Sequence, residues 1–153
     1  MKIRVVWVGK TRNASLSAVC NNMAARIRHM TGFAISELKE TRVSDDKKRI
    51  EAEGEKILGH IDRSDYVVAL DAEGRSHSSE TIATFIGKHM VENPRDLVFV
   101  VGGPGGLSVA VRKRANLTWS LSKLTFSHDL ARTILMEQLY RALAIINNLP
   151  YAR

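Results

Sequence analysis

The chain has little of what a disulfide framework, a metal centre or a membrane span requires. It holds a single cysteine among 153 residues, so Cys20 cannot close an internal disulfide. No cluster of Cys and His side chains has the spacing of metal ligands. No apolar run approaches the roughly 18 residues that a membrane helix needs. We therefore expect no metal and no membrane partner, and we expect Cys20 to pack as a small hydrophobe on a helix.

We also expect no secretion signal at the amino terminus. Residues 3–8 are a short β-branched run that ends at Gly9, and no small-residue cleavage site follows. No linker, repeat or low-complexity segment divides the chain, which is long enough to bury a sizeable core. A single domain over residues 1–153 and a cytoplasmic location are expected.

Basic residues outnumber acidic residues in this chain. The chain carries 23 Lys and Arg against 16 Asp and Glu, a formal net charge of +7 at pH 7. Basic side chains near phosphates release counterions and steer association, so the excess favours a nucleic-acid partner. An effect on solubility alone is the other explanation.

Alternating strand-like and helix-like segments with short connections indicate an α/β fold. Strands are expected over residues 3–8, 33–38, 65–70, 97–101 and 117–121, and helices over 15–29, 44–61, 78–91, 107–115 and 128–147. This order predicts a mainly parallel sheet with helices on both faces. Ser15 is the expected cap of the first helix, and a turn at Gly74 is expected after the third strand.

The last helix, over residues 128–147, is apolar around most of its circumference. Such a helix must be buried on more than one side. In a small domain, another subunit can cover the second side; the alternative is that the helix crosses the sheet beneath loops. We expect a homodimer.

Two loops near the carboxyl terminus indicate a small-molecule site. The strand over 97–101 runs into a glycine loop, residues 102–106, where a missing Cβ lets a ligand come close. The loop is neither a P-loop nor the dinucleotide fingerprint, which follows a first strand. Residues 122–127 offer backbone hydrogen bonds in apolar surroundings. Ligands gather at the carboxyl ends of parallel strands, although a tight structural turn would also explain the glycines.

Several basic residues lie close to these loops. Arg112-Lys113-Arg114 follows the glycine loop, and Lys10, Arg12 and Arg75 add to the same charge. They either contact phosphates or form a solvated surface. His128, at the start of the last helix, is a polar site residue or a surface residue.

The residues that carry a family resemblance form an ordered set across the chain. They are Leu70-Asp71-Ala72-Glu73-Gly74-Arg75, Ser78-Ser79-Glu80, Val101 to Leu107, Trp119 to His128, Arg132, Glu137 to Ala142, and Asn147-x-x-Pro150-Tyr151. The set resembles the SPOUT superfamily of knotted methyltransferases, and within it the pseudouridine N3-methyltransferases of the large ribosomal subunit. The match covers essentially the whole chain.

The resemblance implies a C-terminal trefoil knot, a homodimer that uses the last helix, and S-adenosylmethionine as cofactor. By position, the cofactor-binding residues would be Leu70, Gly103, Ser122, Lys123, Leu124, Thr125, Phe126 and Ser127. The implied reaction is methyl transfer to N3 of a pseudouridine in large-subunit (23S) ribosomal RNA of the assembled ribosome. His128 would act as base or would position the substrate, and Tyr151 and Arg153 would reach the site of the same or the partner subunit.

Other functions stay open at this point. The chain could be another knotted methyltransferase that acts on tRNA, or on uridine rather than pseudouridine. These bases differ by one ring atom, and the sequence does not indicate which of them is the substrate. A ribosome-binding protein without catalysis would have no need for the glycine loop or for residues 122–127. A flavodoxin-like or Rossmann protein is disfavoured because the first strand has no phosphate loop.

Overall fold

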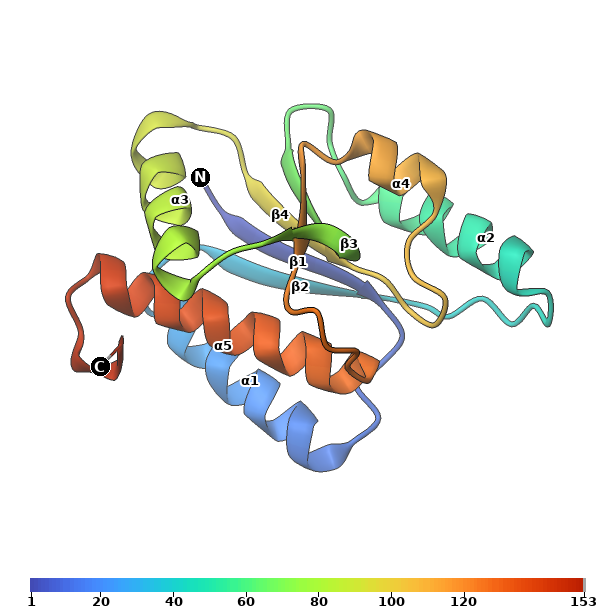
Figure 1. The fold of residues 1–153 in the computed structure, drawn as a ribbon, viewed down its shortest axis with the longest axis horizontal. Coiled ribbons are helices and arrows are strands. Elements are labelled where there is room, and N and C mark those ends of the chain that lie inside the picture. The colour runs from blue at the N-terminus through green and yellow to red at the C-terminus, as the bar shows by residue number, and fades with distance from the viewer. Residues whose placement is uncertain (153) are drawn as a thin grey trace.

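Five strands form one parallel sheet in the order β2-β1-β4-β3-β5 in the computed structural model, which describes residues 1–152 (Figure 1). The strands are β1 (Ile3–Val8), β2 (Phe33–Leu38), β3 (Tyr66–Ser76), β4 (Leu97–Val101) and β5 (Leu117–Ser120). Each of the four neighbouring pairs is parallel. The parallel α/β fold expected from the alternating pattern is confirmed.

Helices cover both faces of this sheet (Figure 1). They are α1 (Ala14–Arg28), α2 (Asp46–Gly59), α3 (Ser79–Glu92), α4 (Val109–Arg114) and α5 (His128–Ile146), followed by a short 3₁₀ helix, η1 (Pro150–Ala152). Successive strand residues point to opposite faces, so β4 contributes Phe99 to the core beneath α1, α3 and α5 and Val100 to the core beneath α2 and α4. Both faces of the central strands are therefore dry, as in other parallel sheets.

Every α-helix begins with a side chain that accepts a backbone N–H from its first turn. The pairs are Asn13 with Leu16, Asp45 with Lys48, Ser78 with Thr81, Ser108 with Val111, and Ser127 with Leu130. Each cap is worth about 1 kcal/mol. The expectation that Ser15 caps the first helix was wrong, because Asn13 takes that position.

Strand β3 is longer than its apolar run. It continues through Gly74 to Ser76 and pairs with β5 on both sides of a register shift between Leu70 and Arg75. The turn expected at Gly74 was therefore wrong. A Cβ at Gly74 would lie 2.7 Å from the backbone carbonyl carbon of Trp119. The glycine is needed because β5 approaches closely there.

Helix α5 packs between α1 and α3, and its side chains Leu135, Leu139 and Leu143 are buried. The chain itself thus covers much of the apolar surface that led us to expect a second subunit. The homodimer and the trefoil knot stay predictions. Within residues 1–152, no helix is long and apolar enough to cross a membrane, and no group of His, Cys, Asp and Glu side chains could hold a metal ion.

Candidate functional site

A cavity of about 440 Å³ opens at the carboxyl end of β4 and beside the middle of β3, where the pairing with β5 shifts register, and we call it the β3/β4 cavity. Three segments line it: residues 70–73 in the middle of β3, the glycine loop with its flanks (Val101 to Leu107), and residues 120–126. His128 and Ala131 of α5 and Arg112 of α4 complete the wall. Its volume lies in the range of pockets for small molecules.

The glycine loop folds back tightly on itself. Gly105 and Gly106 have φ angles of +85° and +86°, and Gly106 N donates a hydrogen bond of 3.0 Å to Gly103 O. A Cβ at Gly102 would lie 2.8 Å from the carbonyl carbon of Gly106. A Cβ at Gly103 would meet only Glu53 Oε2, at 3.5 Å, an ordinary contact. The contacts of the fold therefore do not require glycine at position 103, which lines the cavity.

The segment over residues 120–126 is shaped by its serines. Ser120 Oγ donates to Ser122 O at 2.8 Å, and Leu124 N donates to Ser122 Oγ at 3.1 Å. These bonds leave Leu124 at the cavity with 72% of its surface exposed. An exposed leucine in a cavity wall gives a ligand apolar surface to cover.

Two opposite charges meet in the wall of the β3/β4 cavity. Arg112 Nε lies 2.7 Å from Asp71 Oδ2, and the Asp71 side chain is only 9% exposed. Sequence reasoning treated Arg112 as part of a basic cluster and did not pair it with Asp71. The available signal was the position of Asp71 directly after the last apolar residue of a buried strand.

Most of the residues expected at the site are together in this cavity. Those lining it are Leu70, Gly103, Ser122, Leu124, Thr125, Phe126 and His128. Lys123 is exposed and does not line it. Ser127 caps α5 and lines a smaller neighbouring cavity, which also contains His128.

Tyr151 lies far from the β3/β4 cavity of its own chain. Its hydroxyl donates a 2.9 Å hydrogen bond to Glu137 Oε1, and its ring centre is 4.6 Å from that of Tyr140. Burial raises the pKa of Tyr151, and the bond to Glu137 raises it further. Glu137 and Tyr140 lie about 14 and 18 Å from His128 along the axis of α5. Arg153, the other expected tail residue, lies outside the described residues.

Comparison with known proteins identifies relatives along the whole chain. A family model described as "Predicted SPOUT methyltransferase" matches residues 1–152. The chain is 42% identical to the Ribosomal RNA large subunit methyltransferase H of Christiangramia forsetii, with 99% of this chain and 98% of the relative covered. It is 39% identical to the protein of that name from Trichlorobacter lovleyi, with 99% of each covered.

A solved structure supports the fold. The probable methylase family protein from Haemophilus influenzae Rd KW20 superposes with a TM-score of 0.58 at 14% identity, covering 95% of this chain and 68% of the other. At this identity the likeness concerns the arrangement of strands and helices.

Proposed function

The chain belongs to the SPOUT methyltransferase family, and we propose that it methylates N3 of a pseudouridine in large-subunit (23S) ribosomal RNA of the assembled ribosome, using S-adenosylmethionine. The observation that carries the proposal is that three segments meet in the β3/β4 cavity: residues 70–73 of β3, the glycine loop and residues 120–126. The names of the relatives supply the large-subunit RNA as substrate. An enzyme with this substrate acts in the cytoplasm, where ribosomes lie.

The residues of the β3/β4 cavity fit S-adenosylmethionine. Leu70, Leu124 and Phe126 provide apolar surface for a flat base, and Gly103 of the glycine loop lines the same cavity. The carboxylate of Asp71 places negative charge beside a cationic ligand. When bound, the cofactor supplies a methyl group activated by the sulfonium.

The chain then has to hold the acceptor base in line with that methyl group. N3 of the base carries an imide proton that must leave. His128 is exposed at the cavity and is the first residue of α5, so it can accept that proton or position the base. Backbone N–H groups at the start of the same helix favour the negative charge that develops on the ring.

We propose that the enzyme works as a homodimer. Because Tyr151 packs on Glu137 and Tyr140, about 14–18 Å along α5 from His128, a tail that takes part in the reaction would act at the cavity of another copy. An antiparallel arrangement of two α5 helices would bring each tail to the other cavity. Tyr151 would then stack on or hydrogen-bond the base, and Arg153 would hold a phosphate or a carbonyl.

The test is methyl transfer from labelled S-adenosylmethionine to ribosomes that lack the modification. Matched ribosomes that still carry uridine at the target and a naked RNA hairpin are the comparison substrates. Label only in pseudouridine-containing ribosomes is the expected result. Label in the uridine ribosomes, in the hairpin alone, or in tRNA would overturn the proposed specificity. Cofactor binding by calorimetry separates a different RNA substrate from a protein that has lost catalysis.

A further inference from the structure

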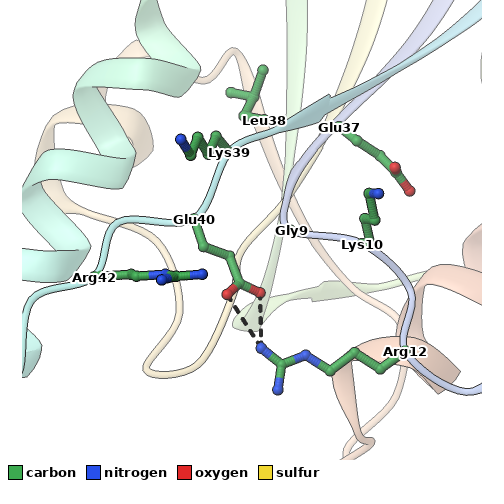
Figure 2. Close-up of a pocket in the computed structure, with 8 residues that line it drawn as sticks. All are labelled: Gly9, Lys10, Arg12, Glu37, Leu38, Lys39, Glu40 and Arg42. Atoms are coloured by element: carbon green, nitrogen blue, oxygen red, sulfur yellow. Dashed lines mark hydrogen bonds and ion pairs between the residues drawn. The ribbon is translucent and has the colours of Figure 1, made fainter.

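A second cavity, of about 420 Å³, lies beyond the carboxyl ends of β1 and β2, and we call it the β1/β2 cavity (Figure 2). Its lining residues are Gly9, Lys10, Arg12, Glu37, Leu38, Lys39, Glu40 and Arg42. Four of these eight side chains are basic and two are acidic. Two loops distant in sequence form it, and they meet because β1 and β2 pair along their whole length.

A smaller cavity, of about 270 Å³, adjoins both the β1/β2 cavity and the proposed reaction site. It shares Lys10, Arg12 and Glu40 with the β1/β2 cavity. It shares His128 with the β3/β4 cavity. The three cavities therefore follow one another along this edge of the sheet from β2 to β3, and together we call them the carboxyl-edge groove.

The charges in this groove are incompletely balanced. Arg12 Nη2 lies 3.1 and 3.2 Å from the two carboxylate oxygens of Glu40, as Figure 2 shows. Within residues 1–152, no carboxylate lies at ion-pair distance from Lys10, Lys39 or Arg42. These three exposed side chains leave a local positive charge that a polyanion can neutralise.

One wall of the groove is fixed to the helix that begins at the reaction site. The Asp129 carboxylate accepts hydrogen bonds from the backbone N–H groups of Arg12, at 3.2 Å, and Asn13, at 2.8 Å. Arg132, three residues further along α5, donates to Val8 O at 2.5 Å and to Gly9 O at 3.0 Å. These hydrogen bonds fix the position of the loop that carries Lys10 and Arg12 relative to His128.

We propose that the carboxyl-edge groove binds the sugar-phosphate backbone of the RNA strand next to the methylated base, with Lys10, Lys39 and Arg42 contacting phosphates. The inference rests on the proposed function, because a strand whose base enters the β3/β4 cavity continues past His128. The basic side chains are exposed and spaced along a groove, which suits successive phosphates rather than one compact anion. Glu40 keeps Arg12 neutralised and so limits how tightly RNA without the target is held.

The test compares Lys39→Gln/Arg42→Gln with the wild-type chain. Equilibrium binding to unmodified ribosomes is measured by sedimentation at several salt concentrations, alongside KM, kcat and the calorimetric Kd for S-adenosylmethionine. We expect affinity for ribosomes to fall about tenfold and the salt slope to decrease by about 0.7 for each lost contact to a single strand. The kcat at saturating ribosomes and the Kd for the cofactor should stay unchanged.

Two further variants sharpen the comparison. Lys88→Gln removes a charge from α3, where Lys88 pairs with Glu92, and should change neither affinity nor salt slope. Glu40→Gln frees Arg12 and should tighten ribosome binding about threefold. Equal affinities and slopes for the double variant and Lys88→Gln would overturn the proposal.

The groove and the proposed function fail in distinguishable ways. Methyl transfer by the double variant with unchanged KM would reject the groove and keep the function. If the double variant binds ribosomes more weakly than the wild type, and the wild type itself transfers no methyl group, the groove is kept and the reaction is rejected.

Discussion

Arg112 and Asp71 form an ion pair in the wall of the β3/β4 cavity, with Nε 2.7 Å from Oδ2. S-adenosylmethionine carries one more positive charge than S-adenosylhomocysteine, so the two side chains have opposite effects on cofactor and product. Asp71→Asn should weaken cofactor binding relative to product binding by about three- to tenfold, and Arg112→Gln should shift the ratio the other way. Calorimetric Kd values for both ligands check this.

The control for this pair is stability. Asp71 Oδ1 also accepts a hydrogen bond of 2.9 Å from Glu73 N, which an asparagine oxygen can still accept. The unfolding midpoint of Asp71→Asn should therefore match the wild type, whereas Arg112→Gln should lower it because the nearly buried Asp71 carboxylate loses its ion-pair partner. A ratio that moves in the same direction in both variants would contradict the charge argument.

Gly103 and Gly102 should respond differently to alanine. A Cβ at Gly103 meets only Glu53 at an ordinary distance, so Gly103→Ala should change the free energy of unfolding by less than about 0.5 kcal/mol. It should nevertheless weaken the binding of S-adenosylmethionine about tenfold, because the alanine side chain is added to a residue that lines the cavity. Gly102→Ala should cost about 1–3 kcal/mol, because Gly106 stands 2.8 Å from the new atom. Urea unfolding and calorimetry measure both effects, and unchanged cofactor affinity in Gly103→Ala would count against the site.

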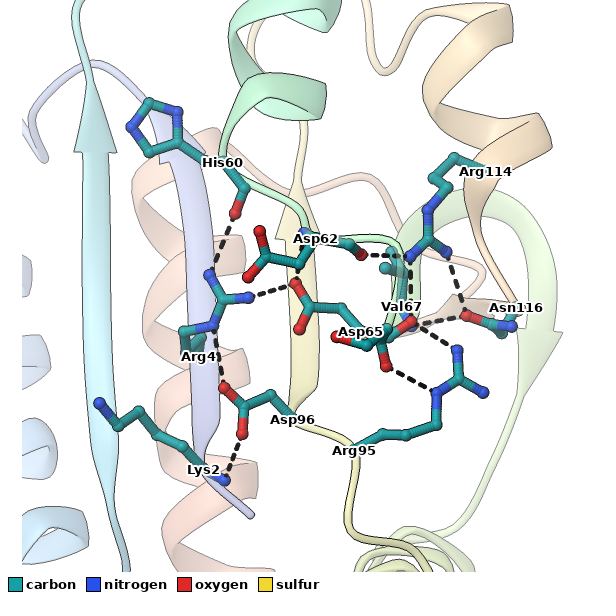
Figure 3. A network of polar contacts seen from close by, with 11 residues as sticks. Lys2, Arg4, His60, Asp62, Asp65, Val67, Arg95, Asp96, Arg114 and Asn116 are labelled. Atoms are coloured by element: carbon teal, nitrogen blue, oxygen red, sulfur yellow. Dashed lines mark hydrogen bonds and ion pairs between the residues drawn. The ribbon is translucent and has the colours of Figure 1, made fainter.

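Asp65 organises a polar network at the opposite, amino-terminal edge of the sheet (Figure 3). Its nearly buried carboxylate pairs with Arg4, and its carbonyl accepts hydrogen bonds from Arg95 at 2.7 Å and Arg114 at 3.0 Å. Asp65→Ala leaves the Arg4 guanidinium without its main partner, and should lower the free energy of unfolding by about 2–4 kcal/mol. The measurement is urea unfolding.

Asp96 provides the matched comparison for Asp65. It lies 3.6 Å from Arg4 Nε, is more exposed, and also accepts the backbone N–H of Lys2. Asp96→Ala should cost about 1 kcal/mol or less. Both variants should retain wild-type affinity for S-adenosylmethionine, since the network lies at the far end of the strands; a loss of affinity in folded Asp65→Ala would show that the two edges are coupled.

Cys20 should be unreactive in the folded chain. It is 3% exposed, its Sγ lies 3.4 Å from Thr133 Oγ1, and burial raises the pKa of its thiol. Because the thiolate is the reactive form, labelling by a disulfide reagent at about pH 8 should become fast only in denaturant. Fast labelling of the native chain would contradict the packing.

The same thiol contributes to the pH dependence of stability. Its folded pKa is above its unfolded value of about 8.5, so the folded chain holds the proton more tightly. The contribution is complete below that unfolded value and is lost as the pH rises through the folded one. Cys20→Ala should therefore show a shallower loss of stability than the wild type in that range, measured by urea unfolding at stepped pH.

The sequence was informative where one strand or helix determines its own boundaries. The bounds of β1, β2 and β4 were predicted to the residue, because each is a largely apolar run that is followed by a charged residue or a glycine. The second half of β3 was missed because residues 71–76 are polar, and their strand conformation depends on pairing with β5. Asn13 and Ser15 are both good caps; Asn13 is held by Asp129, 116 residues away.

The candidate site shows the same division. Leu70 and Gly103 were found because strand ends and glycines are visible in sequence, and the structure places them in one cavity. Lys123 was included as part of a continuous segment, but only some of that segment lines the cavity. Lys39 and Arg42 were not singled out, because their loop meets Lys10 only through the pairing of β1 with β2.

Strand β4 lies at the centre of the sheet although it is fourth in sequence. Ile3 and Tyr66 both pair with Leu97, so β1 and β3 have no common neighbour until residues 97–101 exist. At synthesis rates of about 5–20 residues per second, β1 waits roughly 5–20 s for that neighbour. Contacts of such long separation also slow folding. During translation the amino-terminal half thus carries apolar strands without their central neighbour until two thirds of the chain has been made, and the core is complete only when α5 has followed.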